Sequence, residues 1–245
     1  MSVLTCSLQL PRAKTLRRRC AVLLCGLLLR CIPACAQTFQ TLPEVDFYYK
    51  IQPRIQFIFQ AKETREAGDP TQAEIGPSLD LSVKPLLGLK RITAFDLNEA
   101  KSRLMELSVG YRYVPSPNKA TVERLELVAT PHFPLPDRIL LTDRNRADLD
   151  WSQGQLNWRY RNRVNLERSV RIGSYHPGPH ASAEVFYLSK YHKWNTTALY
   201  AGCLLPVGKH AEFDPYYEHQ NITSMTPNQR LNQFGLILNL YFQAR

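Results

Sequence analysis

The chain has 245 residues and a formal net charge of +10, with 31 Lys and Arg against 21 Asp and Glu. A basic charge of this size is typical of nucleic-acid-binding proteins, but six of the basic residues and none of the acidic ones lie in residues 1–36. The remainder holds 25 basic and 21 acidic residues, which is too balanced for a polyanion-binding domain, and no nucleic-acid partner is expected.

Residues 1–36 have the pattern of a cleaved signal peptide. A cationic stretch from Lys14 to Arg19 precedes the apolar run CAVLLCGLLL at 20–29, and the small residues ACA at 34–36 precede Gln37. The apolar run is too short for a membrane-spanning helix. We therefore predict export and a single mature domain over residues 37–245. The stretch IPAC also resembles a bacterial lipoprotein cleavage box, so acylation of Cys35 stays open as an alternative.

Five of the six cysteines lie in the leader, which leaves Cys203 alone in the mature chain. A lone cysteine excludes an intrachain disulfide scaffold, and no C-x-x-C pair offers a zinc site. We expect no metal and no cofactor, and Cys203 is interpreted as a small buried or lipid-facing residue.

The mature chain alternates between apolar and polar residues with a period of two. In RIQFIFQAK (54–62), Ile55, Phe57 and Phe59 share one face, and FGLILNLYF near the C-terminus repeats the pattern. Alternation over this length predicts strands with one apolar face. The predicted strands cover 44–51, 54–62, 73–84, 104–113, 124–130, 139–151, 155–168, 181–191, 197–206, 210–220 and 230–242. Short turns separate most of them, whereas the connections at 85–101 and 169–180 are long.

The strands are long and their polar faces are unlike a soluble surface. AEIGPSLDLSVK (73–84) and RILLTDRNRADLDW (138–151) reach 12–14 residues, and membrane-crossing strands need about 9–11. The polar faces hold Gly, Ser, Asn, Gln and Thr together with dense Arg, Asp and Glu, which suits a lumen better than a solvated surface. These features predict a closed antiparallel transmembrane β-barrel of about 10–12 strands in the bacterial outer membrane, with the apolar face toward lipid.

Aromatic residues near the predicted strand ends are typical of the girdles at a membrane interface. These residues are Tyr113, Trp151, Trp158, Tyr187, Tyr191, Trp194 and Tyr241.

Several segments resemble a known family in the order expected. They include LPEVDFYYKI, EIGPSLDLSVKP, GYRYV, LPDRILLTDRNRADLDW, WRYRNRVNLER, AEVFY and GLILNLYF. The chain is thereby similar to the uncharacterised bacterial outer-membrane barrel family known as domain of unknown function 2490, over roughly residues 42–242. The resemblance implies an exported outer-membrane barrel and supplies no mechanism. The family pattern places an aromatic residue at the C-terminus, whereas here Phe242 lies three residues earlier.

A charged network is predicted inside the barrel on two neighbouring strands and the one that follows. Its members are Arg144, Arg146, Asp148, Asp150, Arg159, Arg161, Arg163, Glu167 and Glu184. A short turn between antiparallel strands should bring Asp148 and Asp150 near the arginines at 159–163, and Arg144 and Arg146 near Glu167. The network either braces a narrow lumen or selects an anionic solute or lipid headgroup.

Three functions remain open at this stage. The pattern favours a structural or narrow-pore barrel that contacts outer-membrane lipid and is inserted through its C-terminal strand. A barrel enzyme acting on lipid is the second alternative, because SYHPGPH places Ser174, His176 and His180 in one loop. We interpret that stretch as a polar turn rich in Pro and Gly. The same histidines, four residues apart, could hold a metal on a helix, but Pro177 and Pro179 forbid the helix. A soluble periplasmic β-domain that binds a ligand is the third, and the oligomeric state is not specified.

Overall fold

The structure, a computed structural model, describes residues 38–83, 103–117, 119–224 and 228–243. Residues 1–36, predicted to be a signal peptide, lie outside this range. The described residues form eleven strands and one short 3₁₀ helix, and none of them belongs to a helix long and apolar enough to cross a membrane. The elements are β1 (Thr38–Gln52), β2 (Ile55–Glu66), β3 (Asp69–Val83), β4 (Met105–Ser116), β5 (Lys119–Leu135), β6 (Ile139–Ser152), β7 (Gln155–Arg168), β8 (Gly178–Leu188), η2 (Ser189–Tyr191), β9 (Lys193–Val207), β10 (Ala211–Ile222) and β11 (Gln229–Gln243).

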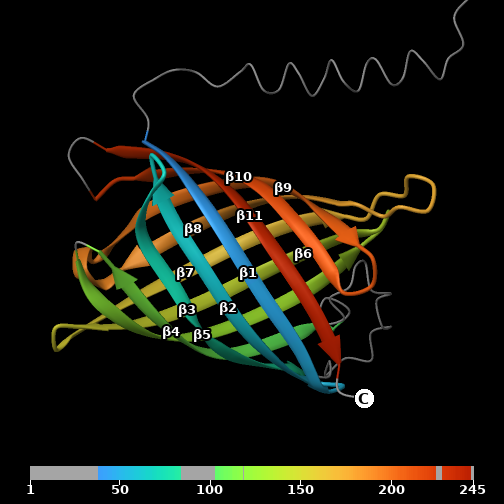
Figure 1. The fold of residues 1–245 in the computed structure, drawn as a ribbon, viewed down its shortest axis with the longest axis horizontal. Helices are drawn as coiled ribbons and strands as arrows, with labels where there is room; N and C mark the ends of the chain where they lie inside the picture. The colour runs from blue at the N-terminus through green and yellow to red at the C-terminus, as the bar shows by residue number, and fades with distance from the viewer. Residues whose placement is uncertain (1–37, 84–102, 118, 225–227, 244–245) are drawn as a thin grey trace, which may run out of the picture. The chain divides into compact units, whose positions relative to one another are not determined.

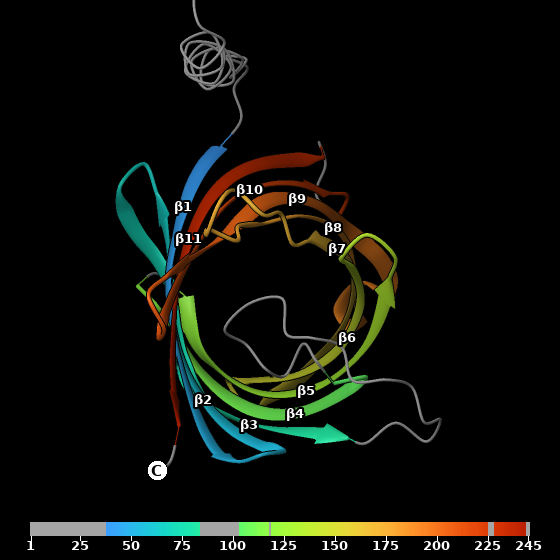
Figure 2. The same cartoon turned by 90° about the vertical axis from the view of Figure 1, so that its right-hand side faces the viewer.

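The strands close into one barrel in which each strand pairs with its neighbours in the chain, and β1 pairs with β11. Figure 1 shows β1 and β11 side by side, and Figure 2 shows the strands arranged as a ring. The predicted all-β closed barrel of 10–12 strands is confirmed. The expectation of a wholly antiparallel barrel is wrong at one seam, because β1 and β11 run parallel from Thr38↔Leu231 to Lys50↔Gln243.

The parallel seam follows from an odd number of strands. The short strand predicted at 44–51 is the full-length β1, and it makes the eleventh strand. The barrel therefore begins at one rim and ends at the other. We call the rim where β1 begins the N-terminal rim, and the rim where β11 ends the C-terminal rim. The long β3–β4 and β7–β8 connections both leave from the C-terminal rim, although residues 84–102 lie outside the described residues.

Tight turns fix the register of three hairpins. Positive φ occurs at both residues of the two-residue turns Ala67–Gly68 and Gln153–Gly154, and at Asp137 and Arg138, the last two residues of the three-residue β5–β6 turn. This is the conformation of a type I′ turn, whose twist matches that of the flanking strands. The turn at Gln153–Gly154 sets Ser152 opposite Gln155 and thereby determines every pair between β6 and β7.

The outer wall of the barrel is apolar and the inner wall is polar. Outward positions include Leu79 and Leu81 on β3, Val109 on β4, and Leu199 on β9, whose side chain is 61% exposed. Inward charged residues such as Asp80 on β3 and Arg112 on β4 are buried inside. A soluble protein has the opposite arrangement, with apolar side chains inside. The observed arrangement agrees with the outward apolar face and inward polar face predicted from the two-residue period.

A pair of inward glycines makes room for one large inner side chain. A Cβ on Gly235 would lie 2.1 Å from ring atoms of Tyr216, and one on Gly202 would lie 2.8 Å from the Tyr216 Cβ. Tyr216 is buried and packs with Tyr200, Phe186, Ala198 and Leu42 in the small apolar cluster of the interior. Glycine at 235 is therefore required to seat the tyrosine ring, and glycine at 202 leaves room for the Tyr216 Cβ and the His180 imidazole, whose Nε2 would lie 2.7 Å from a Cβ there.

Aromatic side chains gather on the outer wall near the N-terminal rim. Trp158 stacks on Tyr187 with ring centroids 5.2 Å apart, and Tyr187 meets Trp194 edge-on at 5.7 Å. Trp158 and Trp194 are about half exposed, as is Trp151 at the end of β6. Tyr241 was assigned to the same girdle, but it is buried inside the barrel and donates a hydrogen bond to Glu212. In β11 the odd-numbered positions, which include Tyr241, face the interior.

One outward patch is polar. Asn162 Nδ2 donates to Asp143 Oδ1 at 2.6 Å and to Asn145 Oδ1 at 3.1 Å, and Tyr160 Oη also donates to Asn145 Oδ1. These residues occupy the outward parity in the middle of β6 and β7. Tyr160 thus belongs to an outer polar patch defined by Asp143, Asn145, Tyr160 and Asn162.

Candidate functional site

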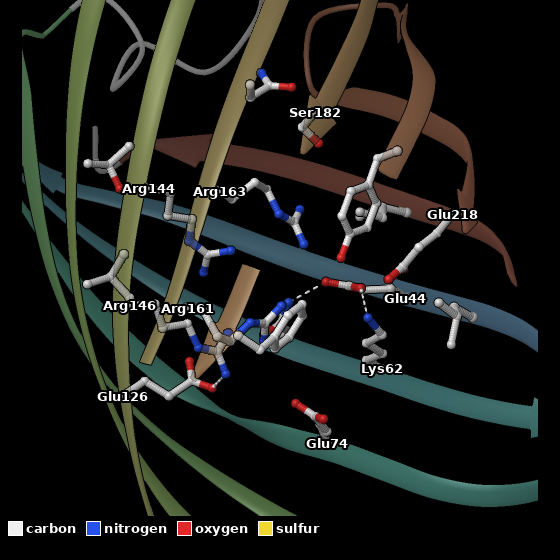
Figure 3. A pocket seen from close by; sticks show the side chains of 18 of the residues that line it. Glu44, Lys62, Glu74, Glu126, Arg144, Arg146, Arg161, Arg163, Ser182 and Glu218 are labelled. Carbon is white, nitrogen blue, oxygen red and sulfur yellow. Dashed lines mark hydrogen bonds and ion pairs between the residues drawn. The ribbon is translucent and has the colours of Figure 1, made fainter. Parts of the chain in front are cut away.

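The inner wall encloses a cavity of about 730 Å³ lined mainly by polar and charged side chains. Side chains from β6 and β7 project into it from one side, and side chains from β1, β2, β3 and β10 from the other (Figure 3). The structure places Arg144, Arg146, Arg159, Arg161, Arg163 and Glu167 on the cavity lining. Asp148, Asp150 and Glu184 lie on the same inner parity and bind arginines directly.

The β6–β7 register places arginines opposite arginines. Arg144 lies across from Arg163, and Arg146 lies across from Arg161. Like charges in directly opposed positions repel one another unless carboxylates are interposed. The acids of the neighbouring strands supply that compensation for most of the arginines.

Asp148 is the centre of the first ion-pair cluster. Its carboxylate has no solvent exposure and accepts hydrogen bonds from Arg146 Nε at 2.5 Å and from Arg159 Nη2 at 2.7 Å. Arg146 also reaches Glu126 on β5, and Glu126 in turn pairs with Arg112 on β4 at 3.4 Å. Three guanidinium groups therefore share two carboxylates.

Glu184 is the centre of the second cluster. It accepts from Arg161 Nε at 2.8 Å, from Arg163 Nη2 at 2.7 Å and from Tyr200 Oη at 2.7 Å. The Arg161 guanidinium lies over the ring of Phe186 and that of Arg163 over the ring of Tyr200, at 4.6 and 4.1 Å from the centroids. Cation–π contacts of this kind fix the guanidinium planes and add to the attraction of the carboxylate.

One proximity predicted from the sequence is wrong. Arg144 and Arg146 do not meet Glu167, because the two-residue turn sets Glu167 opposite Leu140, four positions beyond Arg144. Asp150 faces Asn157 on β7 and forms its ion pair with Arg124 on β5, at 2.6 Å. The expected proximity of Asp148 to Arg159 does occur.

Sequence reasoning missed the contribution of the strands before β6. Arg112 joins the first cluster through Glu126, and Arg124 bridges Asp150 to Glu74 on β3. All of these residues occupy inward-facing positions of predicted strands. The alternation of inward and outward residues could therefore have identified them, but it does not reveal which strands lie near one another in a barrel.

An acidic wall lies across the cavity from the arginines. In the ring order, β1 is five strands from β6 in one direction and five from β7 in the other, so it faces the β6–β7 hairpin. β1 contributes Glu44 and Asp46, and β3 and β10 add Asp80, Asp214 and Glu218 to the lining. Lys62 pairs with Glu44 at 3.5 Å. The cavity is therefore basic on one side and acidic on the other, and its charges generate a field across it.

The loop histidines do not assemble with Ser174. Ser174 and His176 are exposed in the β7–β8 connection, whereas His180 belongs to β8, points inward and bonds Asp214 through Nε2 at 2.8 Å. Among the described residues, no hydrogen bond links Ser174 to either histidine. In that same part of the chain, no three His, Cys, Asp or Glu side chains converge as a metal-ligand set.

An eleven-stranded barrel with an apolar outer wall and a charge-lined interior defines the class of this protein. The chain belongs to the family described as “Protein of unknown function (DUF2490)”, whose profile matches residues 98–231, more than half of the chain. The matched region runs from just before β4 into β11 and includes both arginine clusters. It is narrower than the resemblance over 42–242 drawn from the sequence. No curated protein matches the chain.

Proposed function

We propose that this protein is a bacterial outer-membrane barrel whose charge-lined interior is a narrow passage for polar solutes. The observation that carries the proposal is the inverted distribution of side chains: large apolar groups such as Leu199, Phe234 and Leu236 face outward, and carboxylates and guanidinium groups fill the interior. A closed barrel satisfies its backbone groups internally, so an apolar exterior is stable in lipid and unfavourable in water.

The dimensions and aromatic residues support the same proposal. The strands have 11–17 residues, and a tilted strand of about 9–11 residues crosses the hydrocarbon core. Half-exposed tryptophans at the N-terminal rim suit a membrane interface, where an amphipathic ring contacts both headgroups and acyl chains. The leader-like pattern of residues 1–36 supports export.

The expected partners are outer-membrane lipid on the outer wall and the barrel-insertion machinery at β11. β11 alternates Phe234, Leu236 and Phe242 outward with Gln233 and Asn239 inward. An alternating C-terminal strand with a near-terminal aromatic residue is the type of signal that this machinery recognises. The pairing of β11 with β1 closes the barrel.

Heat modifiability tests the barrel in its membrane setting. A sample folded in detergent should migrate differently on a denaturing gel when it is left unboiled, because a closed barrel resists the detergent until it is heated. The protein should also require detergent to stay in solution. Identical migration together with solubility in plain buffer would favour a soluble ligand-binding barrel instead.

Planar-bilayer recording tests the passage. Steady conductance after insertion is expected, with an ion selectivity that changes when the inner arginines are replaced. An inserted barrel that is electrically silent and hydrolyses or transfers acyl chains would instead identify a lipid enzyme. The Asp143→Asn variant, which changes an outward charge, is the matched control for selectivity.

A further inference from the structure

Arg144 differs from the other arginines of the cavity. Arg146, Arg159, Arg161 and Arg163 each bind a carboxylate, whereas Arg144 forms no hydrogen bond or ion pair with any residue in the described part of the chain. Its side chain extends from β6 into the cavity beside that of Arg163 (Figure 3). The five guanidinium groups of the two clusters share the carboxylates of Glu126, Asp148 and Glu184, and the sixth, that of Arg144, contacts none of them.

The adjacent row of inner side chains is composed of neutral hydrogen-bonding groups. Thr142 lies opposite Asn165, and Asn165 lies opposite Ser182, one step toward the C-terminal rim from the Arg144–Arg163 pair. All three side chains line the cavity. Among the described residues they have no side-chain hydrogen-bond partner, so two hydroxyls and an amide are available beside an uncompensated guanidinium group.

From this arrangement we infer that a small oxyanion, a phosphate or a carboxylate group, binds between Arg144 and Arg163 and is completed by Thr142, Asn165 and Ser182. A guanidinium group presents parallel N–H donors whose spacing matches two oxygens of such an anion. The hydroxyl and amide groups donate to the remaining oxygens. Glu184 on β8 already accepts from Arg161, Arg163 and Tyr200. Glu126 on β5 is paired with Arg112 and Arg146, so neither carboxylate competes for Arg144.

The acidic wall across the cavity favours binding of an anion on the arginine side. Glu44, Asp46 and Glu218 repel an anion from the β1–β10 side of the cavity, while the β6–β7 hairpin attracts it. An anionic solute is therefore drawn to the β6–β7 side of the cavity. The inference rests on the proposed function only in that solutes must reach the interior.

Isothermal titration of the detergent-folded protein with inorganic phosphate, and separately with acetate, tests the site. Saturable binding of at least one of the two anions is expected, and it should weaken as salt is raised. Arg144→Gln should weaken binding at least about tenfold, since it removes one charge-assisted contact. Arg168→Gln, which changes an exposed arginine at the end of the neighbouring strand β7, should bind as the unmodified protein does.

The folding of each variant is checked by its heat-modifiable migration. If Arg144→Gln does not fold, Ser182→Ala takes its place and should also reduce affinity. Absence of saturable binding to the folded, unmodified protein would overturn the inference, and so would equal affinity in a folded Arg144→Gln or Ser182→Ala variant. A barrel that conducts without binding either anion contradicts this inference alone, whereas one that binds an anion without conducting contradicts the passage alone.

Discussion

Arg144 and Arg163 occupy directly opposed positions on β6 and β7, so two like charges face one another across a strand pair inside the barrel. Glu184 compensates Arg163 but does not contact Arg144. A like-charge pair of this kind destabilises a sheet, and the simplest compensation within a cavity is an anion that both guanidinium groups can bind. The repulsion between Arg144 and Arg163 lowers the stability of the empty barrel, and the same two charges favour the anion binding that we propose.

Replacing the buried carboxylate between Arg146 and Arg159 should destabilise the barrel strongly. Asp148→Asn keeps the shape of the side chain but leaves the two guanidinium groups without their shared counter-charge. Removal of one partner from a buried ion pair costs about 3 kcal/mol or more, because the remaining charge stays buried. Denaturant unfolding in micelles, followed by tryptophan fluorescence, measures the change.

Asp137→Asn is the matched control for this substitution. Asp137 is exposed in the β5–β6 turn with φ of 60°, a conformation that asparagine adopts readily. We expect its unfolding midpoint to equal that of the unmodified protein. If both variants unfold at the same denaturant concentration, the arginine cluster does not contribute to stability.

The seating of Tyr216 on Gly235 predicts a specific steric coupling. Gly235→Ala places a methyl group 2.1 Å from the tyrosine ring and should cost about 1–3 kcal/mol, the usual cost of overpacking. Adding Tyr216→Ala removes the clash, so the double variant should be less destabilised than the sum of the two single variants. Additive effects in this double-mutant cycle would show that the backbone moves to accommodate the methyl group.

The architecture could be predicted from the sequence because a period of two specifies both strands and faces. The same parity placed Arg144, Arg161 and Asp148 on the inner wall. The pairing partners could not be predicted, since they depend on turn conformation: the two positive-φ residues at 153–154 shift Glu167 away from Arg144. The acidic wall could not be predicted either, because β1 faces β6 and β7 only when the parallel seam with β11 closes the ring.

The outer polar patch offers a test of what the outer wall contacts. Asp143, Asn145 and Asn162 lie outward in the middle of their strands, where a charged group facing hydrocarbon is unfavourable. The triple variant Asp143→Leu, Asn145→Ala and Asn162→Leu should raise the unfolding midpoint of the protein in lipid bilayers. The same changes on a water-exposed wall should instead promote aggregation without any gain in stability, and that result would argue against a membrane setting.

Phe242 should matter more for insertion in the cell than for stability in vitro. Its ring stacks on Phe47 of β1, with centroids 4.9 Å apart, and lies beside His210. Phe242→Ala removes both the seam contact and the aromatic residue nearest the end of β11. We expect the variant to refold in micelles with a modest loss of stability, but to reach the outer-membrane fraction in clearly reduced amounts.

Phe234→Ala provides the comparison for Phe242→Ala, because Phe234 lies on the same strand and the same outer face but farther from its end. Refolding yields of the two variants should be similar, since each loses one half-exposed aromatic ring from the outer wall. Only Phe242→Ala should lower the amount that reaches the outer membrane, as measured by fractionation and heat-modifiable migration. Equal amounts of both variants in that fraction would show that the insertion machinery does not recognise the C-terminal aromatic residue.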